Sequence, residues 1–162
     1  NNLAFCYINL EKYKEALEYI NHALVAYPNN IDLLSNKGSC LFKLGLYEES
    51  IQFYKSLLIK LPDDQIILNN LGICYEMLGD TGRAITYYKK ALDVEQNDIL
   101  LSNIGFCLFK IEKYNEAITY YEKALELNPK NQEIYKYIGM CLEKLGQYEK
   151  AMESYNLSLG IC

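Results

Sequence analysis

The fold is decided by residues 68–88, which read LNNLGICYEMLGDTGRAITYY. Apolar residues in the first half of this stretch recur at three- and four-residue spacing, which is the period of a helix with one buried face. Gly79 interrupts the pattern, and glycine adopts the left-handed turn that ends a helix at little cost. The small Ala84 and the large Tyr88, four residues apart, continue the helical spacing beyond the turn. The stretch therefore predicts two helices joined by a tight turn.

This helical hairpin is one copy of a unit that recurs along the chain. A small residue, usually glycine, lies two positions before one cysteine in each copy, and another small residue lies ten positions after it. These cysteines follow one another at steps of 34, 34, 33 and 34 residues: Cys6, Cys40, Cys74, Cys107 and Cys141. A period of this size indicates a repeat array. We expect a single array over 1–162, with units at about 1–30, 31–64, 65–97, 98–131 and 132–162, of which the first lacks its opening residues.

The glycines inside the first helix of each unit need a packing reason, since a mid-helix glycine costs about 1 kcal/mol relative to alanine. They are Gly38, Gly72, Gly105 and Gly139. We expect the second helix to press close at these points, with its own small residues opposite: Ala16, Ala84, Ala117 and Ala151. The aromatic residue four positions later should then fill the gap to the next hairpin.

The joints between helices are also marked in the sequence. Glycine occupies the internal turn at Gly45, Gly79 and Gly146, whereas Glu11 and Glu112 take this place in the first and fourth units and should make those turns less relaxed. The pairs 29–30, 63–64 and 97–98, which consist of asparagine and aspartate, lie where the next helix should be capped.

The unit resembles the tetratricopeptide repeat family. The third unit reads Leu68, Leu71-Gly72, Tyr75, Ala84, Tyr88, and the fifth reads Tyr135, Ile138-Gly139, Leu142, Ala151, Tyr155. The resemblance covers essentially the whole chain and implies an all-α, right-handed superhelical solenoid of antiparallel helix pairs with a concave groove. Ser50 stands where the family has alanine, and the third unit is one residue short, with Gln96 in place of proline. We expect a local change of superhelical twist at 94–98.

Composition excludes several functional classes. The chain has no run of eighteen apolar residues for a membrane span and no recognisable signal peptide. Its net charge is −5 and its lysines are scattered among glutamates, which argues against nucleic-acid binding. Because it begins with asparagine in the middle of a repeat, we expect it to be a piece of a longer protein.

The cysteines and the single histidine predict no chemistry. Equivalent residues of stacked hairpins should lie about 8–10 Å apart, too far for a disulfide, and a ladder does not converge on one metal ion. Reduced cysteines favour the cytoplasm, and Cys162 lies outside the register. His22 has no partner for metal binding or catalysis in the sequence pattern. We therefore predict no catalytic residue, no metal and no cofactor.

The resemblance places one row of asparagines in the concave groove: Asn2, Asn36, Asn70 and Asn103. Each amide offers a donor and an acceptor, so the row could pair with the backbone of an extended peptide. The alternative stays open, because asparagine is also common at this position in family members without peptide specificity. Tyr137 takes the place in the fifth unit.

Neighbouring rows give the expected groove a polar centre and apolar patches. The candidate contact residues there are Ser35, Asn69, Ser39, Ile73, Phe106 and Phe109. Exposed apolar patches mark interaction sites, although the phenylalanines could equally be partly buried between hairpins. The family's clamp for the carboxylate end of chaperones is not expected, since no unit has its asparagine in the row of Ser39 and only Lys136 supplies its lysine.

These features predict a non-catalytic scaffold that binds a partner protein or an extended peptide in its groove. One alternative is a regulatory or targeting arm of a larger enzyme, such as a glycosyltransferase, or of a peptide-sensing regulator. The other is a self-associating array. Its last helix carries Met152, Tyr155, Leu159 and Ile161 with no polar capping helix after it, and an uncapped solenoid end can stack on a second copy.

Overall fold

The structure is a computed structural model of the chain, and it describes residues 7–161. This part of the chain is all-helical, without strands. Its helices are α2 (Tyr13–Ala26), α3 (Ile31–Lys43), α4 (Tyr47–Leu58), α5 (Gln65–Met77), α6 (Thr81–Val94), α7 (Asp98–Lys110), α8 (Tyr114–Leu127), α9 (Gln132–Lys144) and α10 (Tyr148–Ser158). The predicted all-α solenoid of antiparallel helix pairs is confirmed.

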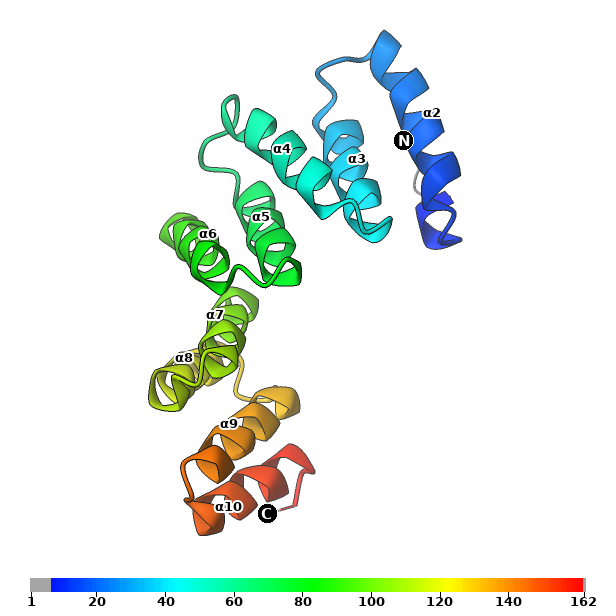
Figure 1. Cartoon of the computed structure of the whole chain (residues 1–162). Helices are drawn as coiled ribbons and strands as arrows, with labels where there is room; N and C mark the ends of the chain where they lie inside the picture. The colour runs from blue at the N-terminus through cyan, green and yellow to red at the C-terminus, as the bar shows by residue number, and fades with distance from the viewer. Residues whose placement is uncertain (1–6, 162) are drawn as a thin grey trace.

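The helix pairs follow one another along an arc, with α2 and α10 at its opposite ends (Figure 1). Each helix packs on its neighbours in the chain, and the first helices of successive pairs also touch, α3 with α5 and α7 with α9. In Figure 1, α5, α7 and α9 lie toward the inside of the arc and α6, α8 and α10 toward the outside. The first helices therefore form a continuous inner face.

The expected caps and turns are present. The side chains of Asn30, Asp64 and Asn97 each accept hydrogen bonds from backbone N–H groups in the first turn of the following helix. The turn glycines have positive φ, and so do Glu11 (φ 56°) and Glu112 (φ 62°). A side chain with a Cβ is disfavoured in this left-handed region, so both glutamates adopt the conformation on which the prediction of less relaxed turns depends.

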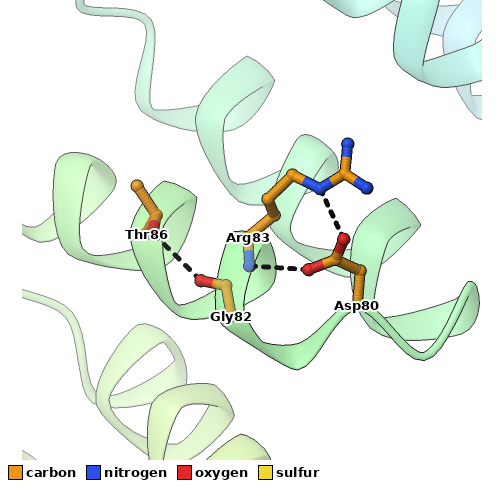
Figure 2. A network of polar contacts seen from close by, with 4 residues as sticks. All are labelled: Asp80, Gly82, Arg83 and Thr86. Carbon is orange, nitrogen blue, oxygen red and sulfur yellow. Dashed lines mark hydrogen bonds and ion pairs between the residues drawn. The ribbon is translucent and has the colours of Figure 1, made fainter.

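Asp80 caps α6 in a different way from the other caps (Figure 2). One carboxylate oxygen accepts from the backbone N–H of Arg83 at 3.0 Å, and the other accepts from its guanidinium. The backbone hydrogen bond is the larger cause, and the guanidinium hydrogen bond the second, that hold the pKa of Asp80 below its usual range. The Arg83 guanidinium also lies 4.6 Å from the ring centre of Tyr75, which ties the start of α6 to α5.

The junction after the third hairpin is short, as the 33-residue step predicts. Three residues, 95–97, connect α6 to α7, whereas 27–30 and 128–131 supply four at the equivalent places and 59–64 supply six. The extended backbone of Glu95 (φ −153°, ψ 133°) makes this connection in so few residues.

The reason given for the mid-helix glycines was wrong in one respect. Their nearest neighbours are the tyrosines of the same hairpin, not the alanines. A Cβ on Gly38 would lie 2.4 Å from the ring of Tyr54, and one on Gly72 would lie 2.4 Å from the ring of Tyr88. The same contact recurs between Gly105 and Tyr121. The glycine is therefore needed because a Cβ would overlap the aromatic ring that packs against the helix at this point.

The cysteines are buried filler, as expected. Cys40, Cys74, Cys107 and Cys141 are all free and at most 1% exposed, while Cys6 and Cys162 lie outside the described residues. Ser50, which replaces the family's alanine, is fully buried. Its hydroxyl donates to the carbonyl of Gly38 at 3.0 Å, so the extra polar atom is satisfied across the hairpin.

Candidate functional site

The inner face carries a pocket between α3 and α5 that contains three of the predicted contact residues. Ser39, Asn70 and Ile73 line it, together with Phe42 and Tyr54, and its volume is about 240 Å³. We call it the α3–α5 pocket. Its walls are mainly apolar, with the amide of Asn70 and the hydroxyls at the base.

The base of the α3–α5 pocket is organised by the buried hydroxyl of Tyr54. The amide nitrogen of Asn70 donates to this oxygen at 3.1 Å, and the Ser39 hydroxyl lies 3.3 Å from it. Burial is the main cause that raises the pKa of Tyr54 to about 12, so the phenol stays protonated and neutral. The Asn70 amide is thus partly engaged by the protein itself, and its oxygen is left to accept from a ligand.

A second pocket lies farther along the inner face, where α5, α7 and α9 meet. Its volume is about 260 Å³, and we call it the α5–α9 pocket. Asn103 and Phe106, both predicted contact residues, line it with Glu76, Glu133 and Tyr137. The ring of Phe106 meets that of Tyr137 edge to face, with centres 5.8 Å apart.

Glu76 is the most connected polar group on this face. It accepts a hydrogen bond from the hydroxyl of Tyr88 at 3.0 Å, and the thiol of Cys107 lies 3.9 Å from the same oxygen. The ammonium of Lys110 lies 3.5 Å from the other oxygen. Burial first and the Glu76 charge second raise the pKa of Cys107 to about 12, so this thiol is no nucleophile at neutral pH.

The remaining predicted residues are distributed along the same helices. Asn69 lines a pocket of about 180 Å³ between α5 and α7, and it accepts a long hydrogen bond of 3.5 Å from the Asn103 amide. Ser35 lies in a small pocket of about 100 Å³ beside Leu57. Asn36 is half-buried on α3. Phe109 packs edge to face on Tyr114, with ring centres 5.5 Å apart.

Asn2, the first member of the predicted asparagine row, lies outside the described residues. Within 7–161, no three histidine, cysteine, aspartate or glutamate side chains gather in a way that could hold a metal ion. The same part of the chain contains no helix long and apolar enough to cross a membrane.

Glu76 and Glu133 line the α5–α9 pocket but were not among the predicted contact residues. Glu76 stands in a row that holds phenylalanine in the units on either side of it, Phe42 and Phe109. A glutamate between two phenylalanines, with a second glutamate in this row only at Glu143 of the fifth unit, was the available signal. Its tyrosine partner follows twelve residues later, a pairing that repeats between Glu143 and the hydroxyl of Tyr155 at 2.8 Å.

Comparison with known proteins covers nearly the whole chain. Family models described as tetratricopeptide repeat match residues 1–30, 29–97, 99–131 and 120–153. Among curated proteins, no sequence matches this chain.

Solved structures of MamA share the fold. One crystal structure of MamA superposes with a TM-score of 0.84 at 20% sequence identity, over 98% of this chain and 87% of that chain. The MamA structure from Desulfovibrio magneticus RS-1 gives a TM-score of 0.88 at 16% identity, over 99% of this chain and 91% of the other. At such identities, the likeness concerns the fold alone.

Proposed function

The chain belongs to the tetratricopeptide repeat family, and from this premise we propose that it is a non-catalytic scaffold that binds a protein or an extended peptide along its inner face. The observation that carries the proposal is the clustering of predicted contact residues in pockets of one face. Ser39, Asn70 and Ile73 share the α3–α5 pocket, and Asn103 and Phe106 share the α5–α9 pocket.

The chemistry of this face suits an extended chain. Asparagine amides from successive units line the two pockets beside apolar and aromatic side chains, so backbone groups of a ligand can pair with the amides while its side chains enter the pockets. Because helices hold these residues, the face is formed before the ligand arrives, which lowers the ordering cost of binding. The buried cysteines contribute packing rather than reactivity, in keeping with a binding role.

The test replaces the inner-face asparagines together. Peptides are selected from a random phage-displayed library on the wild-type protein, and their affinities are measured by fluorescence anisotropy. We expect the variant with Asn36→Ala, Asn70→Ala and Asn103→Ala to lose at least about tenfold in affinity, equivalent to one or two hydrogen bonds. Far-UV circular dichroism checks that helicity is kept.

A matched control changes three exposed asparagines of the second helices, with Asn21→Ala, Asn115→Ala and Asn156→Ala. It removes the same number of amides from other surfaces of the solenoid and should leave the affinity unchanged. Equal affinities for the inner-face variant and this control would contradict the proposal.

A second candidate is self-association through α10. Met152 and Leu159 are 65% and 70% exposed, and Tyr155 and Leu159 line a shallow hollow of about 490 Å³ beside α9. In the fourth unit the equivalent residues, Ile118 and Leu125, pack against the core. Sedimentation velocity at several concentrations tests this candidate, and a monomer at every concentration would exclude it.

A further inference from the structure

We propose that the α5–α9 pocket is a subsite for an arginine side chain of the partner. The inference rests on the proposed function and specifies it, since it assigns a ligand chemistry to one pocket of the inner face. The pocket is formed by three first helices of successive units, α5, α7 and α9, so it exists only in the stacked array.

Charge is the first argument. Two carboxylates line the pocket, Glu76 from α5 and Glu133 from α9. The chain as a whole carries a net charge of −5, which adds to the attraction of a cationic partner. A positively charged side chain is therefore the guest that this pocket favours electrostatically.

The hydrogen-bond acceptors that line the pocket favour arginine over lysine. Ser102 lines the pocket, and its buried hydroxyl oxygen has no hydrogen-bond partner among the described residues, so it becomes an acceptor for a guest when its side chain turns toward the pocket. The Asn103 amide donates to Asn69, which leaves its own oxygen as an acceptor. Glu133 takes one hydrogen bond, from the Tyr137 hydroxyl at 3.2 Å, and has capacity for more. Several acceptors around one space fit a guanidinium, which presents five N–H donors in a plane.

The protein already holds a cation beside two residues of this pocket, Glu76 and Phe106. The Lys110 ammonium lies 3.5 Å from a Glu76 oxygen and 4.8 Å from the ring centre of Phe106. A carboxylate beside an aromatic face is thus an arrangement that stabilises positive charge here. Because Lys110 is 44% exposed, its ammonium is free to swing into solvent when an arginine enters.

The test uses small probes and nuclear magnetic resonance of the ¹⁵N-labelled protein. N-acetyl-arginine N-methylamide is titrated against N-acetyl-citrulline N-methylamide, which has nearly the same shape but carries a neutral urea group. We expect the arginine probe to shift the amide signals of 102–106 and 133–137, and to bind at least about fivefold more tightly than the citrulline probe, as a charge-assisted contact requires. Equal binding of both probes, or shifts confined to other residues, would overturn the proposal.

Two pairs of variants locate the effect. Glu133→Gln should weaken the arginine probe about three- to tenfold, whereas Glu143→Gln should not, although Glu143 is also exposed and accepts a tyrosine hydroxyl. Lys110→Met should strengthen binding by removing the competing ammonium. Lys136→Met removes the same charge from α9, outside the pocket lining, and should change binding less. The spectrum of each variant reports directly whether the variant is folded. Equal effects on arginine binding within either pair would contradict the proposal that arginine binds in the α5–α9 pocket.

The results also separate this inference from the proposed function. If the asparagine variant loses the selected peptides but the arginine probe does not bind, the scaffold proposal stands and the arginine subsite is wrong. If the arginine probe binds at the pocket and the asparagine variant keeps full affinity for the peptides, the subsite stands and peptide binding by the asparagine row is wrong.

Discussion

Two glycines in neighbouring helices should respond in opposite ways to the same substitution. Gly72 lies in α5 beneath the ring of Tyr88, where a Cβ would be 2.4 Å from a ring carbon. Gly82 lies in the first turn of α6, where a Cβ would meet only an oxygen of Asp80 at 3.9 Å (Figure 2). Gly72→Ala should therefore destabilise the protein, and Gly82→Ala should stabilise it.

The magnitude for Gly72→Ala follows from the contacts of the ring. Ordinary contact begins near 3.4 Å, so the ring must move by about 1 Å, and overpacking of this kind costs about 1–3 kcal/mol. The movement also loosens the 3.0 Å hydrogen bond from Tyr88 to Glu76, which is worth about 1.5–3 kcal/mol for a charged acceptor. Alanine regains about 1 kcal/mol of helix propensity. The free energy of unfolding should fall by roughly 2–4 kcal/mol.

Gly82→Ala has no such cost. The backbone carbonyl of Gly82 accepts from the Thr86 hydroxyl at 2.9 Å, and alanine leaves this bond intact. The gain in helix propensity should raise the free energy of unfolding by about 0.5–1 kcal/mol.

Urea unfolding followed by circular dichroism at 222 nm measures both variants. Repeat arrays can unfold in stages, so the comparison uses the transition that includes α5 and α6, identified by a fluorophore placed on each helix. In a double-mutant cycle, Tyr88→Leu removes the ring, and Gly72→Ala should then cost at least about 1 kcal/mol less than in the wild type. A loss below about 0.5 kcal/mol for Gly72→Ala, or the same sign for both glycines, would refute the reasoning from ring packing.

Three further predictions concern single side chains. Tyr121→Phe removes a buried hydroxyl that has no partner among the described residues, so it should leave the free energy of unfolding unchanged or raise it. Tyr88→Phe removes the hydrogen bond to Glu76 and should lower the free energy of unfolding by about 1.5–3 kcal/mol in urea unfolding. A larger loss for Tyr121→Phe than for Tyr88→Phe would contradict these hydrogen-bond assignments. Glu112→Gly relieves a φ of 62° and should raise the thermal midpoint by an amount equivalent to about 0.5 kcal/mol, and a lower midpoint would show that this turn is not strained. Burial is the largest cause that raises the pKa of Cys107 to about 12 and of Cys141 to about 11, so both thiols are protonated at pH 8. Both should therefore react slowly with Ellman's reagent in the native protein and at once in guanidinium chloride. Fast reaction of these two thiols in the native protein would show that they are accessible thiolates.

The helices and their joints could be predicted because their signals are local. Asn30, Asp64 and Asn97 cap the helices that follow them, and a capping side chain reaches only two or three residues along the chain. The left-handed turn at Gly45 is marked by the glycine itself, and the one at Glu112 is marked by its equivalent place in the repeat. The burial of the cysteines could be predicted from their place in a repeated helical pattern, which fixes the face of the helix on which they lie.

The candidate site could be predicted only in part. The resemblance to the family, applied through the repeat register, predicted which residues lie on the inner face, and Asn70 and Asn103 do line pockets on it. Their hydrogen bonds to Tyr54 and Asn69 were not foreseen, because these partners lie 16 and 34 residues away in sequence. Phe109 was expected at the groove surface or between hairpins, and it lies half-buried on Tyr114.

By itself, the sequence determined the unit, its period and its turns, because the period can be read from the recurring residues and the caps and turns depend on residues close together in the chain. The resemblance to the family added the prediction of which residues face the groove. Only the tertiary structure decided which side chains fill the space between different helices. It placed the ring of Tyr88 rather than Ala84 on Gly72, and it brought Glu76 and Glu133, 57 residues apart in sequence, to the same pocket. The physical reason is that the helical period fixes the side of a helix on which each side chain lies, whereas the distance between side chains on different helices depends on how the helices pack.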